Sequence, residues 1–253
     1  MLKYFSYGSG TQTIVLIHGF CENNTCFNQQ VLFFKPTHSV ITVDLPGFGG
    51  SEVQAGVTID EMALEVALVL KHLGVNKCTL FGHSMGGYVT LAFAELYPQV
   101  LKGFGLIHST ALPDNTERIE KRKQSIGFIE KNGKEAYINN FIPGLFAENN
   151  KSKLYVQDFI NEALTGPQEG ITLALKAMMN RPDRIKILEE SKIPVFFGIG
   201  KNDQLISEDV MLKQASICKQ SQVCYLQDSA HMSMVEESDK LNESMAEFLN
   251  DIW

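Results

Sequence analysis

The sequence predicts an α/β fold built around a mostly parallel sheet, and three observations support this prediction. Short apolar runs alternate with amphipathic helical patterns along most of the chain. The runs are continuous, which is typical of strands buried on both faces of a parallel sheet. One run leads through a Gly-x-Ser-x-Gly turn directly into a helical pattern. That order exposes the serine at the carboxyl edge of the sheet, where ligands bind in folds of this class.

The composition is that of an ordinary globular protein, and it narrows the classes of partner. The chain has 253 residues, 44% hydrophobic and 20% charged, which fits one domain or one domain with an insertion. The net charge of −7 opposes a general affinity for nucleic acid or anionic membranes. No apolar run approaches the roughly 18 residues of a membrane span. We therefore expect a small-molecule substrate, no nucleic-acid or membrane partner, and a monomer or homodimer.

The cysteines and histidines show neither a disulfide pattern nor a metal-binding pattern. The five cysteines cannot all pair, and none belongs to a Cys-x-x-Cys motif: they are Cys21, Cys26, Cys78, Cys218 and Cys224. Reduced thiols are typical of the cytoplasm, so we expect a cytoplasmic protein. The six histidines are scattered without the spacing of metal ligands. We expect no metal and no cofactor.

The first half of the chain carries five predicted strands, at residues 2–7, 13–17, 39–43, 77–81 and 101–107. Helical patterns fall at about 25–34, at 58–73 and after the Gly-x-Ser-x-Gly turn. The second of these helices opens with Thr58 and, three residues later, Glu61, which are the residues of a capping box. It stops at Gly74.

The alternation of strands and helices stops between residues 110 and 185. Charged helical patterns replace it, at 114–131, 134–146, 152–164 and 167–180. We predict a helical cap over 110–185, inserted into a core formed by 1–109 and 186–253. In the core the alternation resumes with strands at 194–200 and 222–226 and helices at 207–217 and 234–250.

Two features of the predicted cap leave alternatives open. Its apolar faces include Phe141, Phe146 and Met178, which either pack the helices onto the core or wall a substrate pocket. Basic residues recur on its first helix, at Arg118, Lys121, Arg122 and Lys123. They form either a solvated helix face or a surface that attracts an acidic substrate.

Three residues that follow predicted strands can form a nucleophile and its activating partners. A serine hydroxyl is a weak nucleophile that needs a base, and the base needs an acid that fixes its tautomer. Ser84 lies in the turn between strand and helix, and Asp203 and His231 each follow one of the last two strands. The carboxyl ends of these strands meet at one edge, so the three side chains can converge. The chain order Ser, Asp, His is the one expected on such a sheet.

Each of these assignments has an alternative. Asp114, beyond the strand at 101–107, and Asp228, three residues before His231, could supply the acid instead. Ser84 could be a turn serine without chemistry, and His231 could be a core or capping histidine.

Three further histidines also have two readings. His18 and His83 are candidates to line the pocket; the alternatives are that His18 orders its loop and that His83 has a structural role. His108 either lines the pocket or packs in the core.

The chain resembles the α/β-hydrolase-fold enzymes that carry a helical cap, and the likeness extends over its whole length. It rests on five motifs in the family's order: His18-Gly19-Phe20, Asp44-Leu45-Pro46-Gly47-Phe48-Gly49-Gly50-Ser51, Gly82-His83-Ser84-Met85-Gly86-Gly87, Gly200-Lys201-Asn202-Asp203 and Ala230-His231. The resemblance implies an oxyanion hole formed by the backbone N–H groups of Phe20 and Met85.

The resemblance also implies a reaction. We expect hydrolysis of an ester, thioester or lactone of a small, largely apolar substrate, through an acyl-enzyme on Ser84. A C–C bond hydrolase or lyase using the same three residues is an alternative. A non-catalytic ligand-binding module is an alternative of another class, and the complete set of three residues argues against it.

Overall fold

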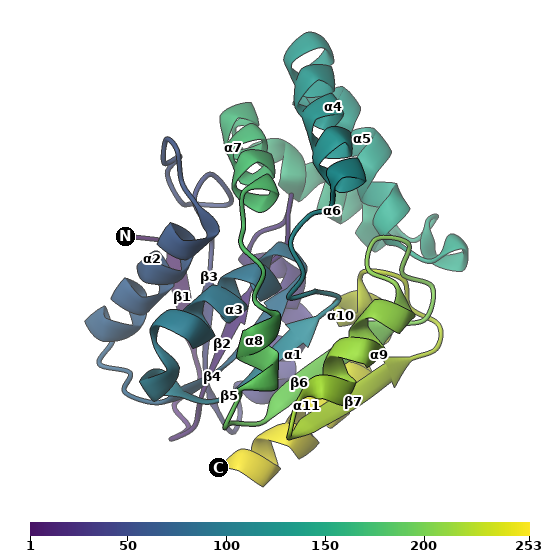
Figure 1. The fold of residues 1–253 in the computed structure, drawn as a ribbon. Coiled ribbons are helices and arrows are strands. Elements are labelled where there is room, and N and C mark those ends of the chain that lie inside the picture. The colour runs from purple at the N-terminus through teal and green to yellow at the C-terminus, as the bar shows by residue number, and fades with distance from the viewer.

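A computed structural model describes all residues from 1 to 253, and at its centre is a seven-stranded sheet (Figure 1). The strand order is β1-β3-β2-β4-β5-β6-β7. Only β1 runs antiparallel to its neighbour, so the predicted mostly parallel sheet is confirmed. The strands are β1 (Tyr4–Tyr7), β2 (Thr13–Ile17), β3 (Ser39–Val43), β4 (Cys78–His83), β5 (Leu101–Ile107), β6 (Val195–Gly200) and β7 (Ser221–Leu226).

Helices cover both faces of the sheet, which explains why β2, β4 and β6 are buried along their whole length. The helices α1 and α11 contact each other, while α2, α3, α8 and α9 form a second contacting series. Their bounds are α1 (Asn28–Phe34), α2 (Ile59–His72), α3 (Met85–Leu96), α8 (Ile185–Glu189), α9 (Glu208–Ile217), α10 (Ser233–Glu236) and α11 (Ser238–Ile252). None of the helices combines the length and the apolar character needed to cross a membrane.

The segment between β5 and β6 is helical, and Figure 1 shows its helices grouped beyond one edge of the sheet. The main helices are α4 (Thr116–Asn132), α5 (Lys134–Phe141), α6 (Leu154–Thr165) and α7 (Gln168–Met179). The backbone N–H of Arg184 donates to the carbonyl of Ala111 at 2.9 Å. This bond joins the two ends of the helical segment, so the segment leaves and re-enters the sheet at one place.

Two predicted helices are interrupted. The helix predicted at 134–146 ends at Phe141, and a 3₁₀ turn (Ile142–Leu145) that contains Pro143 follows it. The helix predicted at 234–250 is broken at Glu237, which separates α10 from α11. The Glu237 carboxylate accepts hydrogen bonds from the amide of Asp228 and the hydroxyl of Ser229.

The turn between β4 and α3 depends on two glycines. A Cβ atom at Gly82 would lie 2.2 Å from the carbonyl oxygen of Gly86, and one at Gly86 would lie 2.1 Å from the carbonyl oxygen of Ile17. Both distances are far below a normal contact, and both partners are backbone atoms that cannot move aside alone. The Gly-x-Ser-x-Gly spacing is therefore a steric requirement of the turn.

We expect Gly82→Ala to lower the free energy of unfolding by about 3 kcal/mol, because the added methyl group overpacks the turn. The matched control is Gly127→Ala in α4, where a Cβ meets nothing within 4 Å. This control should raise the free energy of unfolding by about 0.5–1 kcal/mol, since alanine favours the helix. Urea unfolding of the purified proteins measures both changes. A Gly82→Ala protein as stable as the wild type would contradict the steric account.

Candidate active site

Ser84 sits in a strained turn at the carboxyl end of β4. Its φ is 49° and its ψ is −112°, a conformation that non-glycine residues rarely adopt. Two hydrogen bonds hold the turn: the Ser84 amide donates to the Ile107 carbonyl at 2.9 Å, and the Ser109 hydroxyl donates to the Ser84 carbonyl at 2.7 Å. The side chain stands at the N-terminus of α3 and is half-buried.

Positive φ values mark two further positions. Cys21, with φ 61°, follows the predicted oxyanion donor Phe20, and His108, with φ 48°, follows β5. With Ser84, these are the only residues other than glycine that have a positive φ. All three lie just beyond the carboxyl ends of parallel strands. Backbone strain of this kind tends to gather at functional sites, where the surrounding structure holds it in place.

The structure places Asp203 against His231. The Nδ1–H of His231 donates to Oδ2 of Asp203 at 2.7 Å, and both side chains are buried. The other carboxylate oxygen accepts from the amides of Leu205 and Ile206, at 2.8 and 3.0 Å. Burial opposes the charge on Asp203, but the adjacent His231 outweighs it, so the pKa of Asp203 lies well below its ordinary value. With Nδ1 carrying the proton, Nε2 of His231 is free to accept one.

Neither of the alternative acids touches His231. The carboxylate of Asp114 pairs instead with Arg122 and Arg181. Asp228 is exposed. Ser84 and His231 line the same cavity, although no hydrogen bond joins their side chains.

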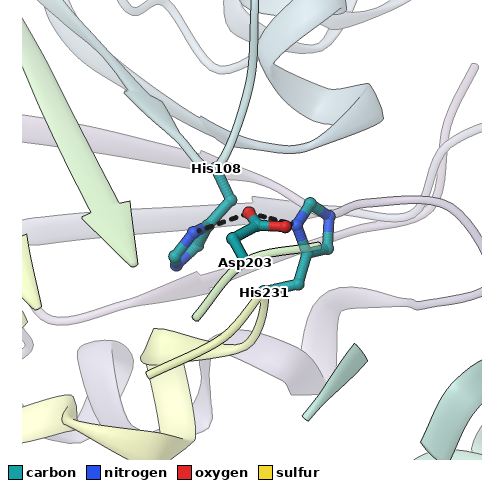
Figure 2. A group of neighbouring side chains, drawn as sticks. All are labelled: His108, Asp203 and His231. Carbon is teal, nitrogen blue, oxygen red and sulfur yellow. Dashed lines mark hydrogen bonds and ion pairs between the residues drawn. The ribbon is translucent and has the colours of Figure 1, made fainter. Parts of the chain in front are cut away.

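Figure 2 shows a second histidine, His108, on the opposite side of Asp203 from His231. Its Nδ1 lies 3.2 Å from Oδ2 of Asp203, although the two atoms are not aligned for a hydrogen bond. Its Nε2 is 2.7 Å from the hydroxyl of Ser233. Burial lowers the pKa of His108 to about 4, so this ring is neutral at pH 7. The sequence-based alternative of core packing describes His108 better than a place in the cavity wall.

The same three side chains are the group that could hold a metal ion. His108, Asp203 and His231 each offer a ligand atom, and these atoms lie within 4.8 Å of one another. However, His231 Nδ1 and Asp203 Oδ2 are only 2.7 Å apart. Ligands bound to zinc at about 2.0–2.1 Å in tetrahedral geometry stand more than 3 Å from each other. The spacing therefore suits a shared proton better than a metal.

The backbone of His231 is fixed on both sides. Its N–H donates to the carbonyl of Leu145, in the helical segment, at 2.9 Å. Its carbonyl accepts from Nε2 of His83, in the core, at 2.8 Å. The preceding amide, Ala230, donates to the carboxylate of Glu236 at 2.9 Å. Sequence reasoning missed Leu145 and Glu236, because nothing in the local pattern reveals contacts so distant along the chain.

The amides of Phe20 and Met85 are free to act as donors. Neither donates to another group in the protein, and Met85 is the first residue of α3. The first amides of a helix have no carbonyl partner inside the helix, and the helix dipole there favours negative charge. The neighbouring Cys21 is not a competing nucleophile, because burial raises the pKa of its thiol well above the ordinary value.

A buried ion pair lies beneath this site and was not anticipated from the sequence. Nδ1 of His83 is 3.0 Å from Oε2 of Glu22, and the two side chains are at most 1% exposed. The same carboxylate oxygen accepts from the amide of Gly19 at 2.9 Å. Both ring nitrogens of His83 face oxygen atoms, the second being the His231 carbonyl, and this arrangement favours a ring protonated at both nitrogens.

Burial opposes the charge on each partner, but their mutual attraction outweighs it. The pKa of His83 is raised and that of Glu22 is lowered. The geometry and both pKa directions favour an imidazolium at His83 paired with the Glu22 carboxylate.

Three of the predicted pocket residues lie outside the cavity. The cavity has a volume of about 580 Å³ and includes Phe141 and Met178 in its wall, but not His18, His83 or Phe146. The ring of Phe146 packs on Tyr155 and Phe159 within the helical segment instead.

His18 and His83 are fully buried beneath the loops that border the site. The Nδ1–H of His18 donates to the Gly19 carbonyl at 2.7 Å, and its Nε2 accepts from the Leu45 amide at 2.9 Å. Both histidines hold backbone groups of neighbouring loops, which agrees with the loop-ordering alternative for His18 and the structural alternative for His83.

Comparisons with known proteins identify the family. A family model described as the alpha/beta hydrolase fold matches residues 12–238. The chain belongs to the alpha/beta hydrolase fold family. It is a hydrolase by family.

Individual relatives of this hydrolase differ in their reactions. It is 27% identical to a 2-hydroxy-6-oxononadienedioate/2-hydroxy-6-oxononatrienedioate hydrolase of Burkholderia vietnamiensis, over 98% of this chain and 90% of that one. It is 30% identical to the dihydrolipoyllysine-residue acetyltransferase component of an acetoin cleaving system of Pseudomonas putida. That match covers 98% of this chain but only 66% of the longer protein.

Solved structures with the same fold include esterases and a lactonase. A thermophilic esterase from Thermogutta terrifontis has a TM-score of 0.94 and 30% identity, covering 99% of this hydrolase and 93% of that chain. The enol-lactonase from Burkholderia xenovorans has a TM-score of 0.91 at 20% identity, covering 98% of this chain and 96% of that chain, which shows a shared fold only.

For this hydrolase we expect the Glu22–His83 pair to show strong coupling in a double-mutant cycle. Glu22→Gln or His83→Gln alone should each lower the free energy of unfolding by about 3–5 kcal/mol, because each leaves a buried charge without its partner. The double variant should lose less than the sum of the two single losses. Urea unfolding measures all four proteins.

The coupling should also depend on pH. The raised pKa of His83 contributes stability that is present below its unfolded value of 6.5 and is lost as the pH rises through the folded value. The lowered pKa of Glu22 contributes stability that is present above 4.5 and is lost as the pH falls through the folded value. The coupling should be greatest between these limits and smaller at pH 9. Additive losses at pH 5.5 would refute the ion pair.

Proposed function

We propose that this hydrolase cleaves a carboxylic ester, thioester or lactone through an acyl-enzyme on Ser84. The observation that carries the proposal is the 2.7 Å hydrogen bond from His231 to Asp203 at the wall of the cavity that Ser84 also lines. The free amides of Phe20 and Met85 support it, because they suit the negative oxygen of a tetrahedral intermediate. The structural likeness to an esterase at 30% identity agrees with this reaction class.

In the first half of the reaction, Oγ of Ser84 attacks the carbonyl carbon of the substrate, and Nε2 of His231 takes the hydroxyl proton. The carbonyl oxygen becomes negatively charged and accepts hydrogen bonds from the Phe20 and Met85 amides. Asp203 stabilises the imidazolium that forms on His231. The intermediate then collapses, the bond to the leaving group breaks, and His231 donates its proton to that group.

In the second half, water replaces the leaving group. His231 takes a proton from the water as it attacks the acyl carbon, and the same two amides hold the new negative oxygen. Collapse breaks the bond to Ser84 Oγ, and His231 returns its proton to the serine. The products are the carboxylic acid and the free enzyme, without a metal or cofactor in any step.

The helical segment supplies much of the cavity wall, and we propose that residues 110–185 act as the cap of a core formed by 1–109 and 186–253. Side chains from α4, α5 and α7 line the cavity together with Phe20 and His231 of the core. The hydrogen bond from the His231 amide to the Leu145 carbonyl couples cap and core at the catalytic base. The apolar side chains among the lining residues suit a small, largely apolar substrate.

Hydrolysis of a C–C bond is the second candidate reaction. It is favoured by the 27% identity to the 2-hydroxy-6-oxononadienedioate/2-hydroxy-6-oxononatrienedioate hydrolase, which spans nearly the whole of both chains. The same base and oxyanion donors could serve such a reaction. Comparing activity on simple esters with activity on vinylogous diketones distinguishes the two reactions.

We expect a fluorophosphonate to label the folded protein at Ser84 and short p-nitrophenyl esters to be hydrolysed. Ser84→Ala should abolish both activities, because the nucleophile is missing. Peptide mapping by mass spectrometry identifies the labelled residue. A folded protein that reacts at no serine would support a non-catalytic binding module instead.

The same assays test the assignment of Asp203 as the acid that supports His231. Asp203→Asn should lower turnover by roughly 10⁴, because it disturbs the tautomer and charge of His231. The matched control is Asp228→Asn, which makes the same change at an exposed carboxylate and should leave turnover within about twofold. The opposite result would show that the acid is misassigned.

A further inference from the structure

All the lysine and arginine side chains that line the cavity with Ser84 come from α4. Arg118, Lys121 and Arg122 line the cavity, and no aspartate or glutamate does. Their spacing of three and four residues places them on one side of the helix. The fourth basic residue of the run, Lys123, is not in the wall. Three residues of this basic run therefore line the cavity, where they can attract an acidic substrate, and one does not.

Arg122 belongs to a buried cluster with an excess of positive charge. Its Nε is 2.5 Å from Oδ2 of Asp114, and Nη1 of Arg181 is 2.7 Å from Oδ1 of the same carboxylate. Two cations thus share one anion. The side chains of Arg122 and Arg181 are only 16% and 2% exposed, and that of Asp114 is fully buried. Limited access of water strengthens the attraction of such a cluster for an added anion.

Arg118 carries a second charge that no acid balances. Its guanidinium donates to the backbone carbonyl of Leu205, which is a neutral partner that also lines the cavity. Lys121 differs, because it is paired with Glu117 at 2.7 Å and both side chains are more than 70% exposed. We therefore assign the anion-attracting character of the wall to Arg118 and Arg122.

Arg122 also has a hydrogen-bond donor group without a partner in the protein. Its Nε and Nη2 face Asp114, at 2.5 and 3.5 Å, and its Nη1 has no partner in the protein. A guanidinium donates to a carboxylate through a planar fork, and such charge-assisted bonds are about twice as strong as neutral ones. A carboxylate is thus the group that best fits this part of the wall.

The cationic wall and the nucleophile line the same cavity. Arg181, which shares Asp114 with Arg122, stacks over the ring of Tyr88 at 3.9 Å. Tyr88 lines the cavity and follows Ser84 by four residues on α3, which is about 6 Å along the helix. Apolar side chains of Phe20, Phe141, Leu175 and Met178 also line the cavity. A short carbon chain can therefore reach from the reacting carbonyl at Ser84 to the arginines.

We propose that the substrate is an ester-type compound whose short apolar chain ends in a carboxylate, and that Arg118 and Arg122 bind this carboxylate. The inference rests on the proposed hydrolysis at Ser84 and adds the class of substrate. This substrate fits both parts of the cavity wall: the apolar side chains contact the carbon chain, and the two arginines bind its charged end.

Three p-nitrophenyl esters with six-carbon chains test the inference: the hexanoate, the mono-ester of adipate, and the 6-aminohexanoate. They end in a methyl, a carboxylate and an ammonium group respectively. We expect kcat/KM to be about ten- to a hundredfold higher for the adipate ester than for the hexanoate ester, and lowest for the aminohexanoate ester. Free adipate should inhibit hydrolysis of the hexanoate ester more strongly than free hexanoate does.

Variants test whether Arg118 and Arg122 cause the preference for the adipate ester. Arg118→Gln and Arg122→Gln should each reduce the ratio of kcat/KM for adipate ester to hexanoate ester by about tenfold. Lys123→Gln removes the same charge from the same helix outside the cavity and should leave the ratio unchanged. If Arg122→Gln does not fold, Arg118→Gln decides alone, since Arg118 makes no ion pair with a buried acid.

The possible outcomes distinguish failure of this inference from failure of the proposed hydrolysis at Ser84. Hydrolysis of the hexanoate ester with no preference for adipate, as ester or inhibitor, would overturn the inference and leave the proposed function standing. A preference that survives both arginine variants would also overturn it. Failure to hydrolyse any ester, with no fluorophosphonate labelling of Ser84, would overturn the proposed function itself.

Discussion

The buried ion pair between Glu22 and His83 is the interaction on which the geometry of the site depends. Glu22 holds the amide of Gly19, one residue before the predicted oxyanion donor Phe20. His83 immediately precedes Ser84, and its ring holds the backbone carbonyl of His231. One pair of side chains thus connects the oxyanion loop, the nucleophile turn and the loop of the base. Burying two charges costs several kcal/mol per ion, so such a pair is maintained only where partners and hydrogen bonds compensate it.

The charges around Asp203 also favour His231 over His108 as the partner of its carboxylate. His231 and His108 both approach the same carboxylate oxygen, but His108 stays neutral at pH 7 because burial lowers its pKa to about 4. A charged His108 would compensate Asp203 and weaken its support of the cation that forms on His231. The negative charge of Asp203 is thereby left to act on His231. The proton of His83 is likewise held elsewhere, between Glu22 and a backbone carbonyl.

The fold could be predicted because its signals are local. A continuous apolar run marks a strand buried on both faces, and the two glycines around Ser84 follow from contacts within a few residues of the turn and with the adjacent strand β2. The interruption at Glu237 could not be predicted, since it depends on hydrogen bonds to Asp228 and Ser229 in a loop whose path is set by the whole sheet.

The site was predictable only in part, because many of its contacts join residues that are distant along the chain. The sequence left three acids open for His231, and the choice among them depends on tertiary structure: Asp114 is engaged by two arginines, whereas Asp203 reaches the imidazole. Glu22 contacts a histidine 61 residues away, and no local sequence pattern reveals a contact over that separation. For Phe146 the sequence left packing and a place in the pocket open, because an apolar face predicts burial but not which surface buries the side chain; it packs on Tyr155 and Phe159.

The most direct test of this account is the protonation state of His83. In protein labelled with ¹⁵N-histidine, the ring nitrogens can be observed by NMR at pH 7, and comparison with His83→Gln assigns the signals of this residue. We expect both nitrogens of His83 to carry protons, since one faces a carboxylate oxygen and the other a carbonyl oxygen. A neutral ring with one nitrogen unprotonated would contradict it, because the three loops would then not be joined by an ion pair.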